Sequence, residues 1–447
     1  MNYEFATVVW GDAFTSLYLK VSLPTLLSPG NLGSFRGKRN SVYRIYTTPQ
    51  DAKRIKESPA FLKLSEIMPT ELIFMQADDF KHQSFECYLR AINKAIDDDA
   101  SFVLLHPDGV WGDGAFANLQ KIATTGKKAV MFATFRVAKE TFVPPLLKRF
   151  LSEDGLVLSV PPRELVKLAL RHLHWETGSH FWNSSHFFEL PSILHWNVKN
   201  EGMLLRYFRL NPLMSTPTKR FEMPLASLDS SDYIIFANPK FDDLHIVQDS
   251  DEIVVFDMCD SKYPNIQIPR NRANVFKVAY WAAGRDSPFY PNTNLYSRRF
   301  FKYKIRIHSG DISPRWKEVE KSSDRIVNSI LFLLRFTPVW YNIKITWEYI
   351  IGLAKSNRTS VKKLVALIIH PKNWPLLIAT FLLAFNRYPQ VVFWLNKYVE
   401  HCDEKHFDRE KVQYLISSLG AVDNRYAEQI LDKLREKGYL YSAPTKK

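Results

Sequence analysis

The stretch Ser101–Phe116, SFVLLHPDGVWGDGAF, decides the fold, because an apolar run ends there in a glycine-rich loop that carries two aspartates. The apolar residues 102–105 predict a short strand that is buried on both faces. Pro107 cannot donate to a strand ladder, and the glycines at 109, 112 and 114 permit tight turns. We therefore expect Asp108 and Asp113 on a tight loop at the end of this strand.

Two interpretations of these aspartates are open. In an open α/β sheet, ligands bind beyond the carboxyl ends of the strands, where a carboxylate can hold a hard divalent cation against phosphate oxygens. Alternatively, Asp108 caps the loop and Asp113 caps a helix that begins near Ala115, each by accepting backbone hydrogen bonds.

Apolar runs and helical patterns alternate along the first part of the chain. Five runs predict strands: Ala6–Trp10, Val42–Tyr46, Glu71–Met75, Phe102–Leu105 and Ala129–Thr134. Amphipathic segments between them predict helices. This alternation predicts an α/β fold with a doubly wound, mainly parallel sheet. Three later runs are expected to return the chain to a sheet: Tyr233–Phe236, Leu244–Val247 and Glu252–Phe256.

A chain of 447 residues is too long for one simple core and is expected to form more than one domain. Residues 1–315 carry the α/β pattern, with a less regular insert at about 136–225 that is rich in histidine and tryptophan. The insert is suited to acceptor recognition, although a packed subdomain with hydrogen-bonded rings explains the same residues. Residues 316–447 show helical apolar stripes and predict a helical C-terminal domain.

Composition narrows the class of protein. A formal net charge of +14 indicates attraction to polyanions such as phosphorylated substrates, anionic lipid surfaces or nucleic acid. The three cysteines are far apart, which argues against a disulfide scaffold or a structural zinc and fits a reducing compartment. We see no secretory signal, and the longest apolar run, Trp374–Phe385, is shorter than a spanning helix. These features predict a cytoplasmic protein.

A compact acidic turn occurs at 249–252, where the sequence reads DSDE. Its Asp249-Ser250-Asp251 pattern suits cation chelation. It also suits an ordinary turn in which the two aspartates accept nearby amide hydrogens.

The segment Phe300–Ile307 alternates between aromatic or apolar side chains and the basic residues Lys302, Lys304 and Arg306, and it leads into His308. A strand with one basic face ending in a histidine can neutralise a diphosphate and add a metal ligand. A solvated edge strand whose lysines prevent pairing with another chain shows the same pattern. The sequence does not separate the two interpretations.

The order of these parts resembles the GT-A class of glycosyltransferases, in particular bacterial enzymes of surface-polysaccharide biosynthesis. The resemblance rests on four parts in order. A first strand has a carboxyl end suited to a nucleotide, and a second strand ends in two threonines. An amphipathic helix follows, and then an apolar strand that ends in an acidic loop. It covers about Ala6–Arg315. Asp108 and Asp113 are more widely spaced than the DxD motif of that class, and Asp249-Ser250-Asp251 matches the motif but comes later in the chain than usual.

The resemblance implies a nucleotide-diphosphate sugar donor and a divalent cation, Mg²⁺ or Mn²⁺. It implies metal ligands at Asp108 and Asp113, with His308 as the downstream histidine, and a base for the acceptor hydroxyl at Asp251 or Glu252. The nucleotide is expected to contact a further set of residues: Trp10, Thr47, Asp108, Lys302, Lys304 and Arg306. The acceptor is expected to be a glycan or a lipid-linked sugar.

Two other functions compete with this interpretation. A nucleotidyltransferase usually has a basic, glycine-rich loop after its first strand, and Gly11-Asp12-Ala13 is too short and acidic for one. A non-catalytic membrane-surface or scaffolding protein is favoured by basic residues and tryptophans interspersed in the C-terminal part. Such a surface is also compatible with an enzyme peripheral to the inner face of the membrane. No nucleic-acid partner is expected, because only net charge supports one.

Overall fold

The structure is a computed structural model. It describes residues 2–37, 41–75, 79–188, 190–218, 220, 240–263, 268–282, 295–356, 374–375, 378–379, 382, 388–402, 412–413, 415–416, 419 and 424–437. The chain divides into two compact units, Met1–Ala273 with Phe300–Asp324, and Asn274–Arg299 with Arg325–Lys447.

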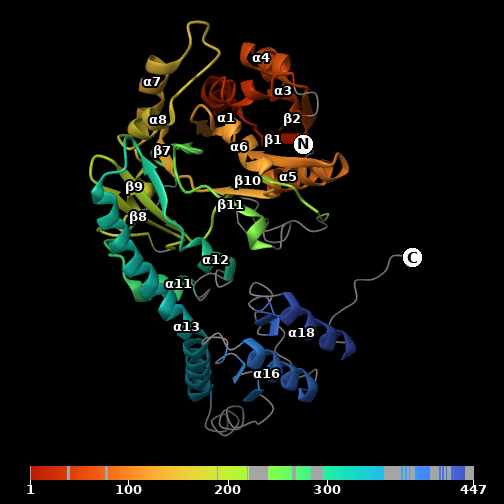
Figure 1. Cartoon of the computed structure of the whole chain (residues 1–447), viewed down its shortest axis with the longest axis vertical. Coiled ribbons are helices and arrows are strands. Elements are labelled where there is room, and N and C mark those ends of the chain that lie inside the picture. Colours follow the sequence, from red (N-terminus) through yellow and green to blue (C-terminus); the bar gives the residue numbers. More distant parts are fainter. Residues whose placement is uncertain are drawn as a thin grey trace. The chain divides into compact units, whose positions relative to one another are not determined.

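A seven-stranded sheet with the order β11-β6-β10-β4-β1-β2-β3 is the centre of the first unit (Figure 1). Its strands are β1 (Asn2–Val8), β2 (Ser41–Thr47), β3 (Thr70–Phe74), β4 (Ala100–Leu105), β6 (Ala129–Phe132), β10 (Asn211–Ser215) and β11 (Leu244–Ile246). β1 runs parallel to β2 and β4, β2 to β3, and β11 to β6. The predicted α/β class with a mainly parallel sheet is therefore confirmed.

β10 is the exception within this sheet, because it runs antiparallel to both β4 and β6. Its register with β6 shifts between Pro212 and Met214, as expected where a proline interrupts the hydrogen-bond ladder. The strand comes from the region that the sequence marked as irregular. In the sheet, β10 lies between β4 on one side and β6 on the other, and β11 lies beyond β6.

Helices cover the sheet, and their starts follow from local sequence. α3 (Pro49–Lys56) and α4 (Pro59–Ile67) each begin with a proline at the first helical position. The hydroxyls of Thr48 and Ser58 cap them by accepting backbone N–H groups. α5 (Asp79–Asp97) packs against β1 and β4, and its Tyr88 hydroxyl donates to the Leu105 carbonyl at 3.2 Å.

The helical segment that follows β1 has three parts: α1 (Asp12–Leu17), a π-helical turn (Tyr18–Ser22) and α2 (Leu23–Leu26). The segment packs in one core with Phe5 of β1 and Phe35. The ring of Phe5 meets that of Phe35 edge-on at 5.1 Å. One face of the sheet is thereby closed by residues that follow the first strand.

A second sheet of three strands lies in the order β5-β12-β7, formed by β5 (Gly109–Trp111), β12 (Val255–Cys259) and β7 (Arg136–Ala138). Within it, Asp257 of β12 pairs with Gly109 on one side and with Arg136 on the other. This sheet therefore brings together residues from three distant parts of the chain.

A third sheet has the order β13-β9-β8, with β8 (Ile193–Val198), β9 (Gly202–Tyr207) and β13 (Ile305–His308). The strand expected at 300–307 is shorter than predicted, because α12 (Leu295–Phe300) and a turn occupy its first half. The strand expected at Tyr233–Phe236 lies outside the described residues.

The described residues of the second unit lie almost entirely in helices. They include α11 (Val275–Ala282), most of α12, α16 (Tyr388–His401), α18 (Asn424–Glu436) and the later part of α13 (Pro314–Ser356). α16 and α18 pack together through apolar side chains such as Leu395 and Ile430. Within the part of the chain that the structure describes, no helix combines the length and apolar character needed to cross a lipid bilayer.

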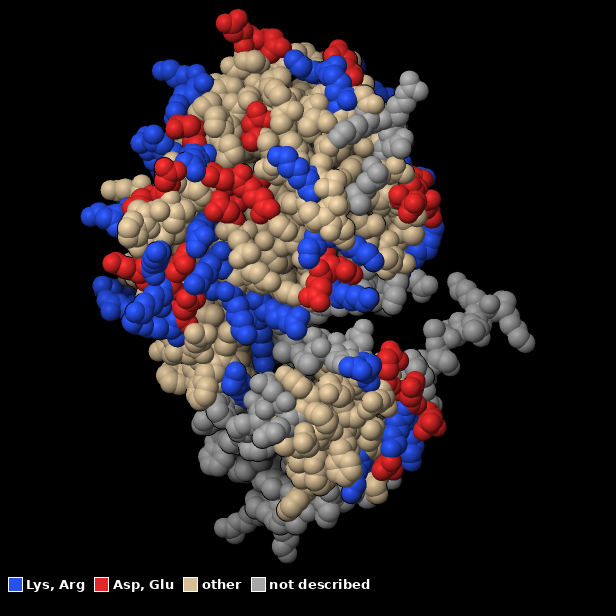
Figure 2. Space-filling model, in the orientation of Figure 1, with Lys and Arg blue, Asp and Glu red and all other residues tan. Residues whose placement is uncertain are grey.

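Charged side chains of both signs are interspersed on the face of the first unit shown in Figure 2. Several basic residues pair with carboxylates, for example Arg163 with Asp251 and Arg149 with Glu164. Local ion pairs therefore neutralise these basic side chains.

Candidate functional site

A pocket of about 250 Å³ opens at the carboxyl ends of β1 and β4. The register that pairs Thr7 with Leu105 puts the ends of these two strands side by side. The pocket is lined by Val8, Val9, Trp10, Phe14, Tyr88, His106, Pro107 and Asp108. It therefore contains two residues that the sequence assigned to nucleotide binding, Trp10 and Asp108.

Three potential metal ligands meet beside this pocket: His106, Asp108 and Asp257. Each offers one ligand atom, and these atoms all lie within 4.8 Å of one another. The Nδ1 atom of His106 is 3.9 Å from Oδ1 of Asp257. His106 and Asp108 follow β4 directly, whereas Asp257 comes from β12, so the group exists only in the folded chain.

The charges in this group are closely coupled. Burial raises the pKa of the Asp257 carboxyl well above its usual range, and the negative charge of Asp108 raises it further. His106 and Arg136 act in the opposite direction. A cation bound between the two carboxylates would offset their repulsion.

The donor set fits a divalent cation. Two carboxylates with an imidazole suit a first-row transition ion such as Mn²⁺, whereas Mg²⁺ prefers oxygen ligands alone. His106-Pro107-Asp108 also has the spacing of a DxD motif, with histidine in the first position.

Hydrogen bonds from neighbouring elements fix the loop that carries Asp108. The backbone N–H of Met258 donates to the Asp108 carbonyl at 2.9 Å, and the Ser22 hydroxyl donates to the Gly109 carbonyl at 2.7 Å. The Trp111 N–H donates to Oγ1 of Thr25 at 3.2 Å. The π-helical turn and α2 therefore hold the loop from one side and β12 holds it from the other.

The loop that carries Trp10 is held by Asp51, at the start of α3. Gly11 has a φ of +79°, a conformation that favours glycine, and its N–H donates to Asp51 Oδ2 at 2.9 Å. The hydroxyls of Thr15 and Thr48 donate to the same carboxylate at 3.2 and 2.7 Å. Sequence analysis did not single out Asp51.

Thr47 does not line the pocket. It ends β2 at the same edge of the sheet, but its side chain is fully buried. Its predicted contact with a nucleotide has no support in this position.

Asp113 lies apart from the ligand group that contains Asp108. Its Oδ1 accepts the Gly30 N–H and its Oδ2 accepts the Ser159 hydroxyl, both at 2.7 Å. It is not the helix cap either, because α6 (Ala115–Thr124) is preceded by Gly114 in the left-handed conformation, without a side-chain cap. Asp113 joins two loops, and its contacts favour a structural role over the predicted metal role.

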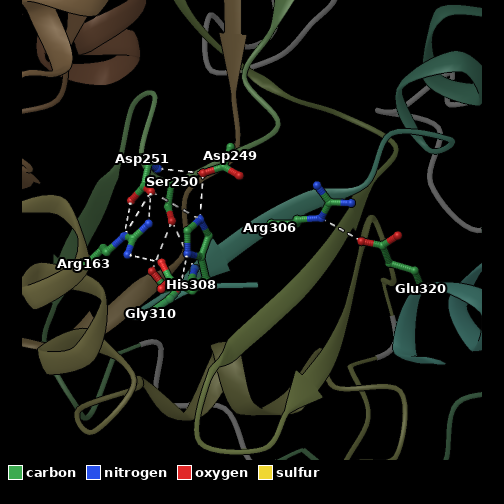
Figure 3. Close-up of polar contacts among 9 residues, drawn as sticks. Arg163, Asp249, Ser250, Asp251, Arg306, His308, Gly310 and Glu320 are labelled. Carbon is green, nitrogen blue, oxygen red and sulfur yellow. Dashed lines mark hydrogen bonds and ion pairs between the residues drawn. The ribbon is translucent and has the colours of Figure 1, made fainter. Parts of the chain in front are cut away.

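Asp249, Asp251 and His308 form a second group of potential ligands, whose ligand atoms also lie within 4.8 Å of one another. Figure 3 shows these three side chains together. His308 is therefore grouped with the later acidic turn and not with Asp108. The Arg163 guanidinium bonds Asp251 through Nε at 3.1 Å and through Nη2 at 2.8 Å, and it bonds Asp311 through Nη1 at 2.7 Å. Arg163 already neutralises the Asp251 carboxylate, which weakens the second group as a cation site.

The predicted diphosphate ligands are paired with the first turns of α13. Arg306 Nε donates to Glu320 Oε1 at 2.7 Å, as Figure 3 shows, and Lys304 Nζ is 2.8 Å from Asp324 Oδ2. Lys302 is exposed, and its carbonyl accepts a hydrogen bond from Arg206. Helix carboxylates pair with Lys304 and Arg306 of the basic face, and these contacts do not favour their predicted role as phosphate ligands.

The two predicted bases are also engaged elsewhere. Asp251 is bonded by Arg163, and Glu252 Oε1 lies 2.8 Å from His245 Nε2. Neither belongs to the group beside the pocket. Their contacts favour roles in holding the turn after β11.

Sequence reasoning missed His106 and Asp257. The first was detectable in principle, because it stands two residues before Asp108 at the end of the same strand. Asp257 follows a run of apolar residues at 253–256, as Asp108 follows 102–105, but nothing local shows that the two strand regions meet.

A scan of the chain against protein-family models found no match, and neither did a search of curated proteins.

Proposed function

We propose that the protein is a glycosyltransferase that moves a sugar from a nucleotide-diphosphate donor to a glycan or lipid-linked acceptor. The observation that carries this proposal is the pocket in which Trp10 and Asp108 lie together at the carboxyl ends of β1 and β4. Aromatic side chains can stack on a base, and the neighbouring carboxylates can hold a divalent cation against a diphosphate. The resemblance to GT-A enzymes supports the reaction class.

The aromatic residues of the pocket are assigned to the base. The Phe14 side chain is 55% exposed and lines the pocket, so a ligand can reach its ring. Trp10 and Tyr88 complete this side of the pocket. Stacking on such rings contributes about 1–3 kcal/mol per base in proteins that bind single nucleic-acid strands.

His106, Asp108 and Asp257 would hold Mn²⁺ or, less favourably, Mg²⁺. The bound cation would offset the negative charge that develops on the diphosphate leaving group as the glycosidic bond breaks. The protein's own contribution is to fix the three ligands through β4, β5 and β12. We assign neither Asp251 nor Glu252 to the reaction, because both are paired outside this group.

Isothermal titration of the purified protein with UDP, GDP, CDP and ADP, with and without Mn²⁺, tests the proposal. One nucleotide should bind in a metal-dependent manner, and Asp108→Asn should lose that binding while its thermal unfolding stays close to that of the wild type. Asp154→Asn is the matched control, because Asp154 is a half-exposed carboxylate that pairs with Lys63 away from the pocket.

Failure of every nucleotide to bind would contradict the proposal. That result would favour the non-catalytic membrane-surface alternative. Most of the residues that favour this alternative have side chains outside the described residues, so the expected association with a membrane face stays a prediction.

A further inference from the structure

The proposed site lacks the cations that sequence analysis assigned to it. Asp108 and Asp257 are acidic, and a nucleoside diphosphate adds further negative charge. Lys304 and Arg306 pair with Glu320 and Asp324 of α13 instead. A cation from another part of the chain is therefore needed beside the metal ligands.

Arg136 is placed to supply this charge. It is the first residue of β7 and pairs with Asp257 in the parallel register of β7 and β12. Residues in register on neighbouring strands carry their side chains on the same face of the sheet, so the Arg136 and Asp257 side chains are neighbours. The Arg136 side chain is 40% exposed, so a ligand can reach it.

The guanidinium of Arg136 is oriented by α9 (Trp175–Ser179). Its Nη1 donates to Glu176 Oε2, in the first turn of that helix. The backbone is fixed as well, because the Arg136 N–H donates to Thr177 Oγ1 at 3.1 Å and the Thr177 hydroxyl donates to the Arg136 carbonyl at 2.8 Å. The histidine-rich insert thereby holds this arginine beside β12.

The guanidinium retains capacity for an anion. It carries five N–H donors in a planar fork that matches phosphate oxygens. Among the described residues, Glu176 is its side-chain hydrogen-bond partner, and the bond uses Nη1. Nε and Nη2 are therefore available for a second, anionic acceptor.

We propose that Arg136 binds the diphosphate of the sugar donor, with Glu176 as the residue that orients its guanidinium. This inference rests on the proposed function and adds a phosphate ligand to it. A charge-assisted bond of this kind should strengthen further as the leaving diphosphate gains negative charge.

The test compares the affinity for the bound nucleoside diphosphate with the affinity for the same nucleoside without phosphates, in saturating Mn²⁺. Arg136→Gln should bind the diphosphate about tenfold or more weakly, because it loses a hydrogen bond to a charged group. Its affinity for the nucleoside should equal that of the wild type. Arg136→Lys keeps the charge but loses the planar set of donors. Its affinity for the diphosphate should therefore lie between those of the wild type and Arg136→Gln.

Arg149→Gln is the matched control. Arg149 is similarly exposed, at 45%, and also pairs with a glutamate, Glu164, at 2.8 Å. It should bind both ligands as the wild type does.

The outcomes separate the two proposals. Absence of nucleotide binding in the wild type would refute the proposed function. Wild-type binding that Arg136→Gln leaves unchanged would overturn only the role of Arg136. Equal losses for nucleoside and diphosphate would also overturn it, because they would indicate a structural effect.

Discussion

The buried His308 forms an ion pair with the partly exposed Asp249, with 2.8 Å between Nε2 and Oδ1. The Nδ1 atom of the same ring lies 2.6 Å from the Gly310 carbonyl, which can only accept a hydrogen bond. Both ring nitrogens therefore face acceptors, an arrangement that favours the charged imidazolium. The hydrogen bond to Asp249 raises the pKa of His308 above its ordinary value of 6.5.

The pair makes stability depend on pH. Because the pKa of His308 is higher in the folded state than in the unfolded state, its contribution is fully present below 6.5 and is lost as pH rises through the folded value. His308→Gln should cost about 1.5–3 kcal/mol at about pH 6, the contribution of a hydrogen bond to a charged group. This cost should shrink by about pH 9.

Urea unfolding of both proteins at several pH values measures this difference. The wild-type protein serves as its own control for all other titrating groups. A cost that stays constant between the two pH values would show that His308 is neutral in the folded protein.

The buried pair between Arg44 and Glu4 should dominate the stability of the sheet centre. Glu4 is fully buried in β1, and Arg44 of β2 pairs with it as well as with Glu71 at 2.8 Å. Burial raises the pKa of Glu4 to about 7, and Arg44 opposes this rise. Arg44→Met should therefore cost about 3–5 kcal/mol in the free energy of unfolding, because it leaves a buried carboxylate without its partner.

The same variant predicts a pH effect of definite sign. Without Arg44, ionised Glu4 is uncompensated, so the cost should increase as pH rises through about 7. Arg54→Met is the control, since the pair of Arg54 with Asp12 is largely exposed and contributes about 0–1 kcal/mol. Equal costs for the two variants in urea unfolding would contradict the prediction.

Much of the parallel part of the fold could be predicted, because its strands are continuous apolar runs that local sequence defines. β4 is the clearest case, since 102–105 is buried throughout. β10 could not be predicted, because its place between β4 and β6 depends on long-range pairing and its sequence contains Pro212. Likewise, the alternation at 300–307 did not reveal that carboxylates of α13 pair with the basic side chains.

The prediction brought together two site residues, both at the ends of parallel strands. Trp10 and Asp108 line the same pocket, as expected for the ends of adjacent parallel strands. Asp257 joins them through the antiparallel pairing of β12 with β5, which leaves no local signature. Asp113, although close to Asp108 in sequence, lies beyond β5 and bonds other loops.

The different roles of Asp113 and Asp257 are testable. Asp113→Ala should lower the free energy of unfolding by about 1–3 kcal/mol, because the Gly30 N–H and the Ser159 hydroxyl lose their acceptor. It should leave Mn²⁺ affinity unchanged. Asp257→Asn should weaken Mn²⁺ binding about tenfold or more by removing a charged ligand.

Titration of Mn²⁺ followed by electron paramagnetic resonance measures both affinities directly, without a nucleotide. Asp249→Asn tests the second acidic group in the same assay and should bind Mn²⁺ as the wild type does. If Asp249→Asn loses Mn²⁺ binding and Asp257→Asn retains it, the cation binds at the group of Asp249, Asp251 and His308 instead.

Asp51 should control nucleotide affinity through the loop that carries Trp10. Asp51→Ala removes the acceptor for the Gly11 N–H and for two hydroxyls, so the loop loses its anchor to α3. We expect nucleotide affinity to fall about tenfold, the result of losing roughly 1.4 kcal/mol of pre-organisation, with Mn²⁺ affinity unchanged. Asp51→Asn should retain part of the affinity, because its amide oxygen still accepts.

Ser58→Ala separates this effect from general destabilisation. Ser58 caps α4 as Thr48 caps α3, so its loss should cost about 1 kcal/mol of stability without reaching the Trp10 loop. Nucleotide titration and thermal unfolding of both variants make the comparison. If Asp51→Ala binds the nucleotide as tightly as Ser58→Ala does, then the position of Trp10 does not depend on Asp51, and the base is held by other walls of the pocket.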